Sequence, residues 1–241
     1  MRIEGEAQDY LLGKKFFSAV KIPISTKEKN VRDRLSFLEN LVKDKKVLHI
    51  GCCDHHELIR DKIAKDIWLH ARLCCKTKRC LGIDINRDAV RYLHDQLQYK
   101  DIICADLIKD RIEEIFSEKW DYMILGELLE HLDNPLLFLS SIRNIYSKCV
   151  DKVVITVPNA FSIHNFIQAS RHKELINSDH KYWFTPYTLA KIATLAGFQI
   201  EEFYFCTSCP PMATSFYEIS FRNFFLKNFP AFRDSLLMIL Y

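Results

Sequence analysis

The sequence predicts a doubly wound α/β domain with a mainly parallel sheet. Short apolar runs rich in β-branched residues alternate with helical-period segments along the chain, which is typical of parallel strands joined by helices. The run Val47–Ile50 stops at Gly51 before a helical pattern, as the first strand of a ligand-binding α/β sheet does. The 241 residues, 49% hydrophobic and 27% charged, are enough for one large domain with a buried core.

The expected strands are short and are each followed by polar or glycine residues. In chain order we predict strands at Lys46–Ile50, Arg79–Ile85, Asp101–Ala105, Trp120–Leu125, Lys152–Val157, Phe198–Cys206 and Leu236–Tyr241.

Helix-start signals separate these strands. Residues able to cap a helix, two of them followed by proline, precede the apolar patterns. We predict helices capped by Asn30 (with Asp33 three residues on), Asn86, Asn134 and Thr185, and one uncapped continuous helix from His56 to Leu73. Gly197 is expected to end the helix that begins at Thr185-Pro186.

The domain organisation follows from these elements. Residues 1–29 are predicted to form an N-terminal helical arm or lid, and residues 30–241 a single domain. Residues 207–232 form an aromatic-rich insertion before the last strand. Its segment Phe216–Phe229 favours either a cover packed over the substrate cavity or a helix at a membrane surface or dimer interface.

Charge and cysteine content exclude several functions. The net charge is +3 with no Lys/Arg block, so we expect no nucleic-acid partner. No apolar run approaches the roughly 20 residues of a membrane span. The charged N-terminus is not a secretory leader, so the nine cysteines are expected to be reduced thiols in the cytoplasm. His70, Cys74, Cys75 and Cys80 lack a second CxxC, so no metal site is predicted.

Three strand ends carry the chemistry. Gly51, Asp84 and Asp106 follow the first three strands, whose carboxyl ends share one edge of a parallel sheet. Asp84 can accept hydrogen bonds from a ribose diol, and Asp106 can accept one from the exocyclic amine of adenine. Cys53 and His55 stand where a pyrophosphate loop needs glycine. The pattern therefore favours an adenosine ligand without phosphates over a dinucleotide.

An ordered set of motifs over residues 30–205 resembles the class I S-adenosylmethionine-dependent methyltransferases, in particular the type 11 and type 23 groups. The matching runs are Val47–Cys52, Gly82–Ile85, Ala105–Leu107, Asp121–Pro135, Val154–Asn159, Phe184–Pro186 and Ala196–Phe198. The resemblance implies a seven-stranded Rossmann-like sheet whose last strand is antiparallel, with helices on both faces. It also implies S-adenosylmethionine as cofactor and S-adenosylhomocysteine as product.

The resemblance implies roles for named residues. The expected cofactor-binding residues are His49, Gly51, Cys52, Asp84, Ile85, Asp106, Leu107, Gly126 and Glu127. His131, expected one helical turn after Glu127, is either a catalytic base or substrate ligand, or a residue that organises the loop before Pro135. His49 stands where the family usually has an acid.

We expect the methyl group to be transferred to an oxygen of a small molecule, in preference to a nitrogen. The resemblance implies a sugar, a glycan precursor or a lipid-linked compound as acceptor. No Asn/Asp-Pro-Pro-Tyr/Phe motif of amine methylation follows the fourth strand. Two alternatives remain at this point: a methyltransferase-like binding module that has lost the cofactor, and a nicotinamide-dependent oxidoreductase. The missing second and third glycines disfavour the oxidoreductase.

Overall fold

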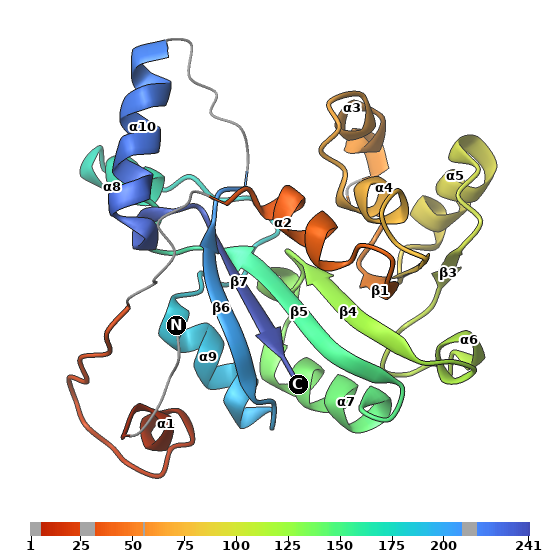
Figure 1. The fold of residues 1–241 in the computed structure, drawn as a ribbon, viewed down its shortest axis with the longest axis horizontal. Helices are drawn as coiled ribbons and strands as arrows, with labels where there is room; N and C mark the ends of the chain where they lie inside the picture. Colours follow the sequence, from red (N-terminus) through yellow and green to blue (C-terminus); the bar gives the residue numbers. More distant parts are fainter. Residues whose placement is uncertain (1–5, 25–31, 55, 209–215) are drawn as a thin grey trace.

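The computed structural model describes residues 6–24, 32–54, 56–208 and 216–241. Its centre is a seven-stranded sheet in the order β3-β2-β1-β4-β5-β7-β6 (Figure 1). The strands are β1 (Lys46–Ile50), β2 (Arg79–Asp84), β3 (Ile102–Cys104), β4 (Trp120–Gly126), β5 (Val150–Pro158), β6 (Ile200–Cys206) and β7 (Ser235–Leu240). Each predicted strand is present within about two residues of its expected limits, and the Rossmann-like fold class is confirmed.

The last strand is antiparallel, as the resemblance implied. β7 lies between β5 and β6 and runs antiparallel to both, whereas the pairs among β1 to β5 are parallel. Every residue of β7 is buried, because the strand has neighbours on both edges and helices on both faces. This explains why polar residues do not alternate with apolar ones in the last strand of the sequence.

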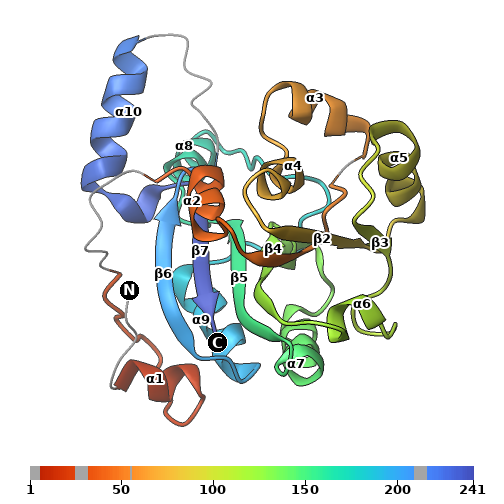
Figure 2. The same ribbon diagram turned by 45° about the vertical axis from the view of Figure 1, so that its right-hand side comes forward.

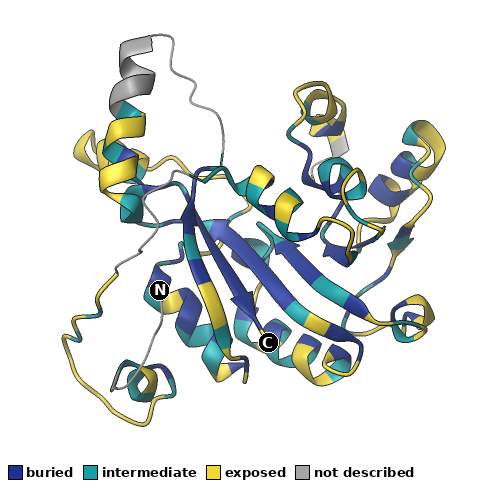
Figure 3. Cartoon of the chain, viewed as in Figure 1, coloured by how far each residue is buried: buried dark blue, intermediate teal, exposed yellow. Residues whose placement is uncertain are grey.

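Helices cover both faces of the sheet (Figure 2). Neighbouring strand residues point to opposite sides: Leu48 packs in the core shared with α7 (Pro135–Tyr146) and α9 (Pro186–Leu195), and Val47 packs in the core shared with α2 (Arg34–Leu41) and α4 (Leu69–Cys74). A third cluster joins α3 (Ile59–Ala64) to α5 (Arg87–Leu97). Buried residues accordingly follow the sheet, while exposed ones lie on the outer helix faces (Figure 3).

Most helix starts agree with the sequence. The side chains of Asn86, Asn134 and Thr185 accept hydrogen bonds from the backbone N–H groups of Ala89, Leu137 and Thr188. The cap of α2 was misassigned: Asp33 accepts from Ser36 N at 2.8 Å, and Asn30 lies outside the described residues. The remaining helices are α6 (Glu113–Phe116) and α8 (Ile163–Ser170), and the single-turn 3₁₀ helices are η1 (His56–Leu58), η2 (Leu129–His131) and η3 (Pro230–Phe232).

The continuous helix predicted from His56 to Leu73 is wrong. The segment divides into η1, α3 and α4, with a break at residues 65–68. Asp66 at the break has a positive φ of 54°, and the indole N–H of Trp68 donates to the carbonyl oxygen of Cys52 at 3.2 Å. Tertiary contact with the turn after β1 therefore overrides a pattern that fits one helix.

The two peripheral segments lie on the side of the molecule that carries β6 and β7 (Figure 1). In the N-terminal arm, α1 (Glu6–Leu11) buries Leu11 and packs against α9. Its role as a lid stays a prediction. In the aromatic insertion, α10 (Phe216–Asn228) is followed by η3, and Phe224 and Phe229 are exposed. The side chains of Phe216–Phe221 lie outside the described residues, and membrane contact through this segment stays a prediction. No helix in the described part of the chain combines the length and apolar character needed to cross a membrane.

Candidate functional site

A cavity of about 750 Å³ opens at the carboxyl ends of β1, β2 and β4. All ten residues predicted for cofactor binding or catalysis line it: His49, Gly51, Cys52, Asp84, Ile85, Asp106, Leu107, Gly126, Glu127 and His131. The parallel sheet brings them together because these strands all end at the same edge.

The turn after β1 requires glycine. Gly51 has a φ of +71°, a conformation that side chains other than glycine rarely adopt. Its backbone N–H donates to the carbonyl oxygen of Ile83 at 2.8 Å, which ties the turn to β2. A Cβ atom at this position would also lie 3.1 Å from Leu128 Cδ1. At Gly51 the cavity is therefore lined by backbone atoms and not by a side chain.

Asp84 closes the same turn from the end of β2. One carboxylate oxygen accepts from the backbone N–H of Cys53 at 2.9 Å, and the other accepts from Asn86 N at 2.9 Å. An ionised carboxylate has about four lone-pair sites. Both oxygens can thus be oriented by the backbone and still accept bonds from a ligand in the cavity.

Asp106 is oriented in a similar way after β3. Its Oδ1 accepts from the backbone N–H groups of Ile108 at 3.0 Å and Lys109 at 3.2 Å, and its Oδ2 lies 3.0 Å from Lys109 Nζ. Burial raises the pKa of Asp106, but the bonds from Lys109 and Ile108 outweigh burial and lower it. The side chain is therefore an ionised acceptor at neutral pH.

The end of β4 brings a glycine and an acid to the cavity. A Cβ atom on Gly126 would lie 2.5 Å from Leu69 Cδ2, closer than carbon atoms can approach. Glu127 has a positive φ of 54°, and its Oε1 lies 3.8 Å from Arg34 Nε. Arg34 also donates to Thr156 Oγ1 at 3.2 Å. The cation that faces Glu127 thus comes from α2, far away in the sequence.

His49 is a buried neutral group. Its Nδ1 lies 3.1 Å from His70 Nδ1, and the residue is 2% exposed. Burial, followed by the charges of His70 and Arg34, lowers the pKa of His49 well below its usual value. The residue therefore supplies a neutral imidazole where the family usually has an acid.

A cysteine–histidine cluster lies behind His49. Cys74 Sγ is 3.6 Å from His70 Nε2, and Cys80 Sγ is 3.9 Å from His70 Nδ1. The two sulfur atoms thus approach different nitrogens of the imidazole ring, and one ligand atom from each of the three residues lies within 4.8 Å of the other two. The eight described cysteines are free thiols.

The expected helical turn from Glu127 to His131 is wrong. The positive φ of Glu127 interrupts the chain, and only the 3₁₀ turn η2 follows. His131 nevertheless lines the cavity, where its ring meets that of His180 edge to face with 4.7 Å between centroids.

Sequence reasoning missed Arg34 and Glu130, whereas His180 was a candidate for the substrate pocket, with a packed aromatic edge as the alternative. Glu130 is fully buried beside His131, and burial together with the charge of Glu127 raises its pKa to about 8. Arg34 and His180 line the cavity. Leu128, Leu129 and Leu132 around Glu130 are compatible with a buried position, whereas nothing local to Arg34 indicated that its segment returns to the sheet edge.

The fold and the cavity define a class of protein: a Rossmann-like domain with a ligand-sized cavity at the carboxyl ends of its parallel strands. The family model described as "Methyltransferase domain" matches residues 25–202. The chain therefore belongs to the methyltransferase domain family, which confirms the resemblance to class I S-adenosylmethionine-dependent methyltransferases and disfavours the oxidoreductase alternative. No curated protein sequence matches the chain.

Solved structures show the same fold at low identity. The small RNA methyltransferase HEN1 aligns over 94% of this chain and 27% of its own, with 13% identity and a TM-score of 0.55. This chain thus spans about a quarter of that protein. The methyltransferase domain of bacterial CtHen1-CN aligns over 86% and 97%, with 16% identity and a TM-score of 0.51. A SAM dependent methyltransferase from Archaeoglobus fulgidus aligns over 86% and 90%, with 22% identity and a TM-score of 0.49.

The cavity fits S-adenosylmethionine, the cofactor of this family. Its volume lies within the range of about 300 to 1,000 Å³ that holds small ligands. Asp84 and Asp106 offer oriented acceptors at neighbouring strand ends. Gly51 and Gly126 keep the floor free of side chains that would collide with Leu128 and Leu69. The cavity keeps this volume although His49 stands where the family usually has an acid and Cys53 stands where a pyrophosphate loop needs glycine.

Proposed function

We propose that this protein transfers a methyl group from S-adenosylmethionine to a hydroxyl oxygen of a small molecule, such as a sugar, a glycan precursor or a lipid-linked compound. The observation that carries the proposal is the convergence of Asp84 and Asp106, from two neighbouring strands, on one cavity that Glu127 and His131 also line.

The cofactor-binding roles extend this proposal. Asp84 would accept hydrogen bonds from the ribose hydroxyls, and Asp106, with Ile85 and Leu107 beside it, would frame the adenine. The methionine part would lie over Gly51 and Cys52, near His49, Gly126 and Glu127. The strand order β3-β2-β1-β4, along which these residues line the cavity, supports the assignments.

When bound, the cofactor supplies an electrophilic methyl group on a sulfonium. The chain then has to align an acceptor oxygen and exclude water, which together account for much of the rate of a direct displacement. Leu132, Leu137 and Phe138 give the outer wall an apolar surface that displaces water. His131 lies on the same wall, and we assign it to contact with the acceptor hydroxyl.

The test combines binding and turnover. Isothermal titration with S-adenosylmethionine and S-adenosylhomocysteine should give one site per chain. Labelled cofactor incubated with a panel of hydroxyl and amine acceptors should then label hydroxyl compounds. An absence of binding at millimolar cofactor would refute the enzymatic proposal, and labelling of amines alone would refute oxygen as the acceptor atom.

A further inference from the structure

Three side chains with metal-binding atoms meet at the cavity wall. Glu130 and His131 come from η2, and His180 comes from the loop between α8 and α9. One ligand atom from each lies within 4.8 Å of the other two. His131 and His180 line the cavity, and Glu130 lies behind them with none of its surface exposed.

The carboxylate of Glu130 is the unusual member. Both of its oxygens are buried and have no hydrogen-bond partner among the described residues, and the same holds for Oε1 of Glu127. A buried carboxylate without a compensating charge or donor is costly, and such groups in proteins are paired or bind metals. Arg34 faces Glu127 only at 3.8 Å and also donates to Thr156. Arg34 alone therefore does not balance the carboxylates of both Glu127 and Glu130.

The loop that carries His180 is fixed to η2. The backbone N–H of Lys181 donates to the carbonyl oxygen of Glu130 at 2.7 Å, and the Tyr182 hydroxyl donates to the carbonyl oxygen of Asp133 at 2.8 Å. Lys181 also forms an ion pair with Asp133. His180 is therefore held next to Glu130 by its neighbours in the chain.

We propose that Glu130, His131 and His180 bind a divalent metal ion at the wall of the cavity. One carboxylate and two imidazoles suit Mn²⁺, Fe²⁺, Co²⁺ or Zn²⁺ better than Mg²⁺ or Ca²⁺, which prefer oxygen ligands. Metal–ligand bonds of about 2.1 Å place ligand atoms at most about 4.2 Å apart, so separations within 4.8 Å are near those that a shared ion requires. The cysteine spacing considered in the sequence gave no indication of this site.

The ion would act on the acceptor, an inference that rests on the proposed function. Its remaining coordination positions face the cavity, because His131 and His180 line it. An acceptor hydroxyl bound there has its pKa lowered by the metal and is held at a fixed position. His131 then contacts the acceptor through the metal rather than as a base.

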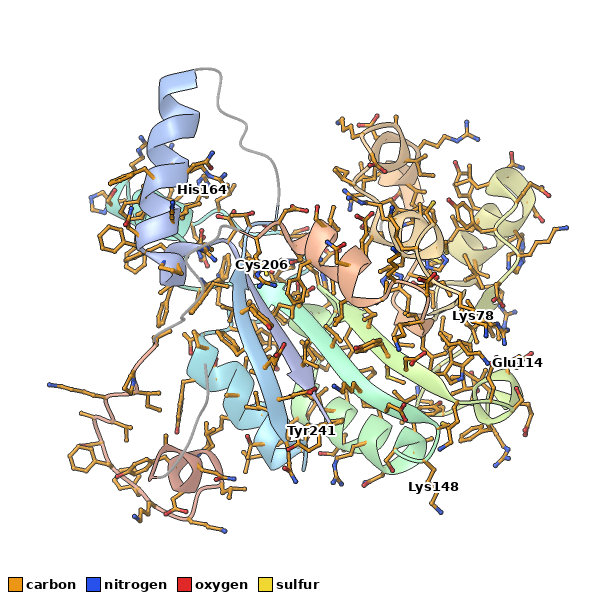
Figure 4. The ribbon with its side chains drawn as sticks, in the orientation of Figure 1. Lys78, Glu114, Lys148, His164, Cys206 and Tyr241 are labelled. Carbon is orange, nitrogen blue, oxygen red and sulfur yellow. The ribbon has the colours of Figure 1, made fainter. Side chains whose placement is uncertain are left out.

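The first experiment measures metal binding alone. The full chain, stripped with a chelator, is titrated with Mn²⁺ and followed by calorimetry and by the electron paramagnetic resonance signal of free Mn²⁺. We expect one site per chain. Glu130→Gln keeps the shape of the side chain, and His180→Ala truncates a loop residue; each should weaken Mn²⁺ binding at least tenfold. His164→Ala, an exposed histidine on α8 at the end of the molecule that carries α10 (Figure 4), should leave binding unchanged.

Absence of Mn²⁺ and Zn²⁺ binding, or equal binding in wild type and both variants, would overturn the metal site. Binding of S-adenosylmethionine to the same samples separates this outcome from failure of the proposed function, because the cofactor residues lie elsewhere in the cavity. With an acceptor in hand, chelation should reduce turnover and be reversed by Mn²⁺, and His164→Ala should respond like wild type.

Discussion

The carboxylate of Asp84 accepts a hydrogen bond from the backbone N–H of Cys53, with 2.9 Å between nitrogen and oxygen. This bond joins the end of β2 to the turn after β1, so one side chain shapes the turn and faces the cavity. In a turn with few glycines, this bond from a side chain helps to fix the backbone conformation.

Asp84→Ala should weaken S-adenosylmethionine binding by about 1.5–3 kcal/mol, the range for hydrogen bonds to a charged group, which corresponds to roughly ten- to a hundredfold in Kd. Calorimetry measures the change. Asp88→Ala is the matched control, because its carboxylate lies on α5 with 85% of the side chain exposed. An unchanged Kd for Asp84→Ala would remove the ribose role.

Gly126→Ala should destabilise the fold and weaken cofactor binding. The added Cβ would lie 2.5 Å from Leu69 Cδ2, and overpacking of this kind costs about 1–3 kcal/mol. Urea unfolding of the single and double variants tests the cause. In a Leu69→Ala background the added methyl group has space, so the further cost of Gly126→Ala should disappear. A cost that persists there would show that the contact with Leu69 is not the reason.

The sheet and most of the site could be predicted because each depends on local pattern. The β-branched runs at Val47–Ile50 and Lys152–Val157 are buried on both faces and read as strands without knowledge of their partners. Asp84 and Asp106 follow such runs directly, and parallel pairing then brings them together.

The parts that could not be predicted depend on contacts between distant segments. Ile63, Ile67 and Ala71 fit a continuous helix, yet the bond from Trp68 to Cys52 breaks it. His180 follows a loop without periodicity, and only its contacts with η2 bring it to His131. Glu130 follows two leucines, and the absence of a hydrogen-bond partner for its carboxylate oxygens among the described residues is visible only once the fold is known.

Thr185→Ala should lower the free energy of unfolding by about 1 kcal/mol, with a range of about 0.5–2. The Thr185 hydroxyl accepts from Thr188 N, and Thr188 Oγ1 accepts from Thr185 N at 2.9 Å, so the two residues form a reciprocal cap for α9. Thr188→Glu keeps an acceptor at the same position of the box and should cost little. Cofactor binding should not change in either variant, because α9 does not line the cavity. A loss of binding in Thr185→Ala would contradict this separation of stability from function.

Cys74 should titrate as a thiolate well below the ordinary range of thiols. Hydrogen bonding from Cys80, opposed by burial and assisted by His70, lowers the pKa of Cys74 to about 5. The thiolate of Cys74 is measured as the difference in ultraviolet absorbance between wild type and Cys74→Ser. This difference should disappear as the pH falls through about 5. Cys80→Ala removes the donor and should move this transition upward, toward the usual thiol value near 9. Because the folded state favours the thiolate, stability relative to Cys74→Ser should be greatest above pH 9, decline as the pH falls from 9 to 5, and vanish below about 5. A transition near 9 in the wild type, or one that Cys80→Ala leaves unmoved, would show that Cys80 does not hold the charge on Cys74.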